Sequence, residues 1–163
     1  MKLLGAMLVL GVCIRCGMTA AAKLTRRAGR IRLLRQLLTD AESALQFTLL
    51  PVGELLHQLA GQAVYRELTF LQDAAAHAES FPESWHTALQ ADSRLMPDEK
   101  AVLETFGSTL GSTALDGQIS TIGLCLERLA QMQTDAEQYA KEKGGLYRSL
   151  GLFGGLFCVI LLL

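Results

Sequence analysis

The sequence predicts an all-α fold, an antiparallel helical bundle of five or six helices flanked by N- and C-terminal transmembrane helices. Two observations lead to this prediction. Along the central chain, apolar residues recur three and four positions apart, as on one face of a helix, and no sustained period-two alternation indicates a strand. The two ends of the 163-residue chain are nearly uncharged: residues 3–22 contain one charged side chain, Arg15, and residues 149–163 contain none.

The apolar ends define the expected domains. A bilayer core about 30 Å thick requires about 20 helical residues, which residues 3–22 supply, and Arg15 would cost about 2.5–3.5 kcal/mol on insertion. Residues 149–163 reach only about 22 Å at about 1.5 Å per residue. To span, the second segment has to include Leu146; a thinned bilayer or a shallow insertion would also serve. We therefore predict a transmembrane helix over residues 1–22, a cytoplasmic helical bundle over residues 23–145 and a transmembrane helix over residues 146–163.

Charge is segregated along the chain. Residues 36–140 carry four basic and 15 acidic side chains, a net charge of −11, whereas basic residues gather beside each apolar end. They are Lys23, Arg26, Arg27, Arg30, Arg32 and Arg35 after the first end, and Lys141, Lys143 and Arg148 before the second. Because basic flanks stay on the cytoplasmic side, this distribution puts the bundle in the cytoplasm. We also expect Arg26, Arg27 and Arg30 to contact anionic lipid headgroups, each attracted by about 1 kcal/mol.

A different interpretation of the N-terminus is a cleaved signal peptide. Lys2 supplies a minimal positive start, and residues 20–22, three alanines, offer a cleavage site. The chain would then be an exported helical binding or sensing domain with a C-terminal membrane anchor. The dense arginine run directly after the apolar segment would resist translocation, which favours the uncleaved, two-pass topology. The side of the membrane on which residues 81–99 lie distinguishes the two.

Prolines and glycines divide the central chain into helices. Pro51 cannot continue a helix but suits the start of one, and Pro82 and Pro97 offer two further starts. We expect helices over residues 24–50, from Pro51 past a weak point at Gly61 to residue 78, from Pro82 through Leu89, from Pro97 to Gly111 and over residues 115–143.

The helical spacing also predicts which side chains are buried. The first helix presents one apolar face made of Ile31, Leu34, Leu38, Ala41 and Leu45. The last helix presents a stripe that begins at Leu115 and extends through Met132 and Ala136 to Tyr139. Trp85, the only tryptophan, is expected in the core rather than at a binding surface.

In the second apolar segment, Gly151 and Gly155 form a G-x-x-x-G pair. Such a pair lets two membrane helices approach closely. We expect it to pack against the first apolar segment or against a second copy of the chain, which would make a homo-oligomer. The alternative is that these glycines have no packing role, because glycine is common in membrane helices.

The sequence offers no active site. It lacks a phosphate-binding G-x-x-x-x-G-K-[ST] loop and the H-E-x-x-H and G-x-S-x-G motifs. Its three histidines, His57, His77 and His86, are scattered, and Asp98 and Glu99 follow Pro97, where they favour a helix dipole rather than acid–base chemistry. The cysteines Cys13, Cys16, Cys125 and Cys158 predict no disulfide framework. We expect no enzymatic activity, no cofactor, no metal site and no nucleic-acid partner.

Several short motifs, taken in order, resemble one protein family over nearly the full chain. They are Met1-Lys2-Leu3-Leu4-Gly5-Ala6, the arginine-rich start of the first long helix, Ser84-Trp85-x-x-Ala88-Leu89, Leu103-x-x-Phe106-Gly107-x-x-Leu110-Gly111, Gln118 and Tyr147-x-x-Leu150-Gly151-x-x-x-Gly155-Leu156-x-x-Val159-Ile160-Leu161-Leu162. The chain resembles the stage III sporulation protein AB family of endospore-forming bacteria. One departure concerns the start of the last helix: the family usually shows a Ser-Asp pair shortly before the glutamine, whereas residues 112–117 read Ser-Thr-Ala-Leu-Asp-Gly.

The resemblance implies a role in an assembly. Proteins of that family belong to a set of eight in the mother-cell membrane around the forespore, which is thought to form a secretion-like channel. The bundle would then be similar to the cytoplasmic domain of the inner-membrane platform proteins of type II secretion. A secretion-type ATPase, which the AA protein of the same operon resembles, would be its cytoplasmic partner, together with other membrane proteins of the channel. The acidic middle of the chain could dock a basic surface of such a partner.

Overall fold

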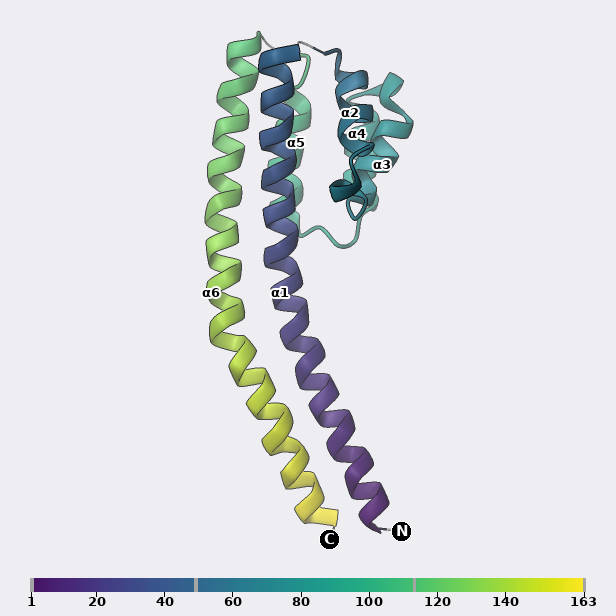
Figure 1. Ribbon diagram of the computed structural model, residues 1–163, viewed down its shortest axis with the longest axis vertical. Helices are drawn as coiled ribbons and strands as arrows, with labels where there is room; N and C mark the ends of the chain where they lie inside the picture. The colour runs from purple at the N-terminus through teal and green to yellow at the C-terminus, as the bar shows by residue number, and fades with distance from the viewer. Residues whose placement is uncertain (1, 49, 113, 163) are drawn as a thin grey trace. The chain divides into compact units, whose positions relative to one another are not determined.

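The computed structural model describes residues 2–48, 50–112 and 114–162, with most side chains of residues 2–21 and 146–162 left out of the description. Within these residues the chain forms six α-helices and no strand, which confirms the all-α class (Figure 1). The helices are α1 (Lys2–Thr48), α2 (Val52–Ala60), α3 (Thr69–Ala76), α4 (Glu83–Ala91), α5 (Pro97–Thr109) and α6 (Leu115–Leu162), with 3₁₀ helices η1 (Ala63–Tyr65) and η2 (Ala78–Ser80) before and after α3.

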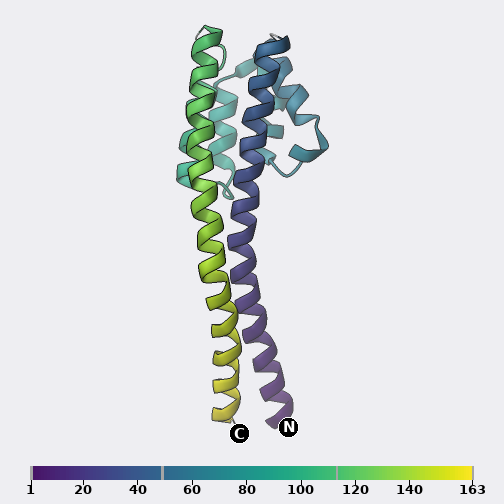
Figure 2. The same ribbon diagram turned by 60° about the vertical axis from the view of Figure 1, so that its left-hand side comes forward.

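The chain divides into two compact units. Unit 1 consists of residues 1–30 and 132–163, and unit 2 consists of residues 31–131. In unit 1 the end segments of α1 and α6 run side by side in opposite directions, with both chain termini at the same end (Figures 1 and 2). Among the residues described, the structure contains no helix that is long and apolar enough to cross a membrane.

The predicted helix starts at prolines are confirmed. Pro51 and Pro82 directly precede α2 and α4, and Pro97 is the first residue of α5. The fixed backbone angle of proline and its missing N–H are tolerated there because the first N–H groups of a helix have no intrahelical partner.

The prediction of one helix from Pro51 to residue 78 is wrong. The chain leaves the helix after Gly61, which caps α2, and continues in extended backbone at Gln62 before η1 and α3. Glycine is a poor helix former, and here the break lets the chain fold back so that Tyr65 is buried. The structure instead joins what we expected to be separate helices at the ends: α1 and α6 each continue without interruption into the apolar segments, and α6 passes through Gly144 and Gly145.

The predicted apolar face of the first helix is confirmed. Its members Ile31, Leu34, Leu38, Ala41 and Leu45 are all buried. On α6, the stripe is buried at Met132 and Ala136, but Tyr139 is exposed, contrary to prediction. An α-helix completes one turn every 3.6 residues. The residue one turn after Ala136 on the inward face is therefore Ala140, which is half-buried, and not Tyr139.

Polar side chains connect elements of unit 2 that are distant in sequence. The Tyr65 hydroxyl donates to Asp40 Oδ2 at 2.5 Å, which ties η1 to α1. Burial and this hydrogen bond to Asp40 raise the pKa of Tyr65. After α4, the Arg94 guanidinium bonds the Asp92 carboxylate at 2.9 and 3.1 Å and holds the pKa of that carboxyl below its usual range, while Thr69 at the start of α3 donates to the same carboxylate.

Candidate functional site at the junction of α4 and α5

Trp85 on α4 is the centre of the junction between α4 and α5. Its side chain is 1% exposed, which confirms the predicted core position. The indole Nε1–H donates to the backbone oxygen of Leu103 on α5 at 2.9 Å. The rings of Phe70 and Phe106 lie 5.4 and 5.6 Å from the indole, within the range of favourable aromatic pairs. A buried indole with its polar atom satisfied fixes α4 against α5.

Gly107 makes this contact possible because it has no side chain. A Cβ atom built at this position would lie 2.4 Å from Trp85 Cδ1 and 2.5 Å from Nε1, distances that real side chains do not show. The indole therefore packs directly on the α5 backbone. Two of the motifs that carried the family resemblance, Ser84-Trp85 and Phe106-Gly107, thus meet in space although the sequence separates them.

Gly111, a second glycine of the family motifs, forms the turn after α5. Gly111 has a positive φ of 73°, a conformation that residues with a Cβ rarely adopt. Its N–H donates to the side-chain oxygen of Gln118 at 3.3 Å, which links the turn to the first turns of α6. The structure places the start of that helix at Leu115, as predicted.

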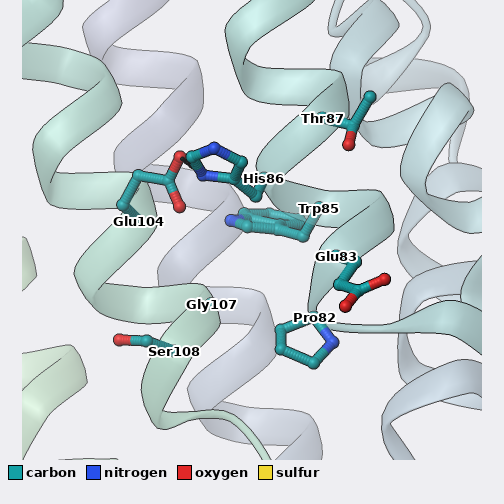
Figure 3. A pocket seen from close by; sticks show the side chains of 8 residues that line it. All are labelled: Pro82, Glu83, Trp85, His86, Thr87, Glu104, Gly107 and Ser108. Carbon is teal, nitrogen blue, oxygen red and sulfur yellow. Dashed lines mark ion pairs between the residues drawn. The ribbon is translucent and has the colours of Figure 1, made fainter.

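A cavity of about 410 Å³ opens beside Trp85 (Figure 3). Figure 3 shows the indole edge-on, between Glu104 with His86 on one side and Pro82 with Gly107 on the other. Its lining comes from the start of α4 and the second half of α5: Pro82, Glu83, Trp85, His86, Thr87, Glu104, Gly107 and Ser108.

The polar groups of this cavity are mainly acceptors. Glu104 is 31% exposed, and its Oε1 lies 2.6 Å from His86 Nδ1 and 3.4 Å from Gln90 Nε2. Ser108 donates its hydroxyl hydrogen to the Thr105 carbonyl at 3.0 Å, which leaves its oxygen as an acceptor. The lining includes two carboxylates but no lysine or arginine. The cavity is thus negative and partly apolar.

Glu99 has a structural role at the start of α5. The predicted position in the first turn is confirmed, and the side chain is fully buried. Its Oε2 accepts a hydrogen bond from the backbone N–H of Met96 at 3.2 Å, an N-terminal capping contact.

Cys125, the free cysteine among the described side chains, is also buried, and burial raises the pKa of its thiol.

The site residues predicted from the sequence lie away from this cavity. Arg26 is exposed, and Arg27 and Arg30 are half-buried, all on the part of α1 that belongs to unit 1. The surroundings of Gly151 and Gly155 fall outside what the structure describes, so their packing role stays a prediction. Within the described part of the chain, no cluster of three His, Cys, Asp or Glu side chains has a metal-binding arrangement.

Sequence reasoning missed the cavity itself. It treated Trp85, His86 and Gly107 as unrelated features of two helices and did not single out Glu104. The available signal was Gly107, a glycine inside the otherwise regular helix from Pro97, in a chain with a single tryptophan on the preceding helix. Such a glycine often marks a close approach of another group to the backbone.

Comparison with known proteins agrees with the motifs. The family model described as stage III sporulation protein AB matches residues 2–163. A protein of Bacillus subtilis (strain 168) named stage III sporulation protein AB is 28% identical over 170 aligned positions, which cover 100% of this chain and 99% of that protein. No solved structure matches the chain. The chain therefore belongs to the stage III sporulation protein AB family.

Proposed function

We propose that this chain is a membrane platform, or scaffold, of a secretion-like sporulation complex that links the mother cell and the forespore. The observation that carries this proposal is the family match over residues 2–163, which includes both apolar ends as well as the bundle. A scaffold role also fits unit 2, whose buried polar groups Tyr65 and Glu99 are engaged in holding the fold together.

In this proposal both ends anchor the chain in the mother-cell membrane around the forespore. The nearly uncharged segments 3–22 and 149–163 belong to unit 1, where the two helices run side by side. Lys23 and Arg26, just beyond the first segment, are exposed, which supports the proposed contact with anionic headgroups. The acidic bundle would face the cytoplasm.

The sidedness of the bundle tests this topology. Ser93 lies exposed in the turn between α4 and α5 and is a suitable position for a single cysteine after the four native cysteines are replaced. Cys125 is buried, and its thiol donates to the Val102 carbonyl oxygen at 3.6 Å. We choose serine to replace it, because the serine hydroxyl keeps a hydrogen-bond donor at this position. We expect a membrane-impermeant maleimide to label Ser93→Cys only after the mother-cell membrane is permeabilised.

Labelling of Ser93→Cys in intact cells would contradict the two-pass topology. It would favour the exported domain with a cleaved N-terminus and a C-terminal anchor. The mass of the mature chain separates these outcomes further, because cleavage after residue 22 would remove Lys2 and the entire first segment.

A cytoplasmic bundle could engage a secretion-type ATPase through its acidic surface. Glu54, Glu67 and Glu79 are exposed around α2 and α3, and this part of the chain has few basic residues. Changing all three to lysine is expected to weaken binding of the ATPase by about tenfold and to remove most of its salt dependence, because surface charges act mainly by long-range attraction. Binding would be measured by surface plasmon resonance at several salt concentrations.

The matched control replaces the same three glutamates with aspartate, which preserves the charge. It should bind the ATPase as the unmodified chain does. Equal affinity of the lysine and aspartate variants would rule out this acidic surface as the docking site.

A further inference from the structure

The outer face of α6 in unit 2 carries an apolar side chain that the chain itself does not cover. Leu124 is 68% exposed, more than any other large aliphatic side chain in the described part of the chain. The inward face of the same stretch holds the buried residues Ile122 and Leu129, and Figure 1 shows α6 at the edge of unit 2. Burying such a leucine against another helix removes apolar surface from water, which favours association.

Leu124 lies in a line of exposed residues with Gly117 and Gln131. The three residues recur every seven positions, which is close to two turns of a helix, so they follow one another along the outer face. This is the spacing of a seam between two packed helices. Because Gly117 has no side chain, the backbone of a second helix can come close at that end of the seam.

Two opposite charges flank this line, one on each side. Glu127 and Arg128 lie one turn after Leu124, and both are exposed. Consecutive residues of a helix do not face each other, so these two side chains are not placed to pair within one chain. Among the residues that the structure describes, neither of them forms a hydrogen bond or an ion pair. Ser120 and Thr121 occupy the same two sides one turn before Leu124.

This pattern is complementary to itself in one orientation. When two copies of the helix lie parallel and in register about a twofold axis, each side of the line faces the other side of the second copy. Leu124 then meets Leu124, and Arg128 of each copy faces Glu127 of the other. An antiparallel pair would instead place Glu127 opposite Ser120 and Arg128 opposite Thr121, which leaves every charge without a counter-charge.

We propose that residues 117–131 of α6 form the interface of a parallel homodimer, with a second copy of this chain as the occupant of the outer face. The charges set the register and the orientation, and Leu124 supplies the apolar contact. A seam of this length is small compared with the interfaces of stable soluble complexes. Insertion of both copies in one membrane raises their effective concentration; this tethering rests on the proposed function, whereas the complementarity of the face does not.

Disulfide formation between copies tests the pairing. The full-length chain without its native cysteines is reconstituted into phosphatidylcholine–phosphatidylglycerol vesicles, oxidised with copper phenanthroline and separated on a non-reducing gel. Gln131→Cys keeps Leu124 and should form a disulfide-linked dimer, because identical seam positions meet in a parallel pair. Thr105→Cys, at an exposed position of α5, is the matched control and should stay monomeric. Adding Leu124→Asp to Gln131→Cys should lower the initial rate of dimer formation by about tenfold.

Reversal of the flanking charges tests the register and the orientation. In the Gln131→Cys background, Glu127→Arg and Arg128→Glu each create two like-charge contacts across the pair, and each should slow dimer formation by about tenfold at low salt. The two changes together restore opposite charges and should restore the rate. High salt should reduce these differences, because exposed charges are screened. Circular dichroism checks that all variants are folded.

The proposal is overturned if Gln131→Cys does not cross-link, which would leave the face to a different protein, or if Thr105→Cys cross-links equally. It is also overturned if the double charge variant pairs no better than the single ones. Failure of the proposed function looks different. Cross-linking of Gln131→Cys combined with labelling of Ser93→Cys from outside the cell would keep the dimer and reject the cytoplasmic platform. A protected Ser93→Cys without cross-linking would do the opposite.

Discussion

Replacing Trp85 with alanine is expected to lower the free energy of unfolding of the chain by about 3–5 kcal/mol, the range for removing a buried aromatic side chain. The indole is 1% exposed and contacts rings on α3 and α5, so its loss leaves a hole among three elements. It also removes the donor to the Leu103 carbonyl. Because the variant has no tryptophan, urea unfolding of the full-length chain in detergent micelles would be followed by far-ultraviolet circular dichroism.

Two further variants test the physical reason. Trp85→Phe keeps an aromatic ring but loses the N–H donor, so it should be destabilised by less than Trp85→Ala. Phe47→Ala removes an aromatic ring that is 84% exposed and should change the free energy of unfolding by no more than about 0.5 kcal/mol. If Trp85→Ala were as mild as Phe47→Ala, the indole would not be a core side chain.

Gly107→Ala is expected to destabilise the chain by about 1–3 kcal/mol, the usual cost of forcing extra atoms into a packed interior. The new methyl would lie 2.4 Å from Trp85 Cδ1, so either the indole or α5 has to move. Alanine is a better helix former than glycine by about 1 kcal/mol, so helix propensity alone would predict that Gly107→Ala stabilises the chain. Urea unfolding measures the change, and tryptophan emission at longer wavelength would show that the indole has been displaced toward water.

Gly123→Ala on α6 is the matched control for this prediction. A Cβ atom there meets no described atom within 4 Å, so the substitution should stabilise the helix by about 0.5–1 kcal/mol. Gly107→Ala should also lose most of its cost when Trp85 is alanine, because the clashing ring is gone. An equal cost in both backgrounds would show that the indole is not what Gly107 accommodates.

Much of the fold could be predicted from short stretches of sequence. Pro51, Pro82 and Pro97 placed three helix starts, and the three-and-four spacing from Ile31 to Leu45 identified a buried face. These signals are local: proline restricts its own backbone, and helical periodicity needs only a few turns to be visible.

The candidate site depended on contacts that no local pattern contains. Trp85 and Leu103 are 18 positions apart, and Tyr65 and Asp40 are 25 positions apart. Whether a glutamate such as Glu83 or Glu104 faces a cavity or open water is decided by which helix packs beside it, and spacing along one helix does not specify this.

By itself, then, the sequence determined the helical class, the segregation of charge, the starts of α2, α4, α5 and α6, and the family. The sequence marked Gly61 only as a weak point within one helix, and the tertiary structure decided that the helix ends there. It alone decided that Trp85 rests on Gly107 and that their packing leaves a negative cavity. The physical reason is that propensity and amphipathicity act between residues a few positions apart. Packing instead selects one arrangement among many helix pairings with similar apolar faces.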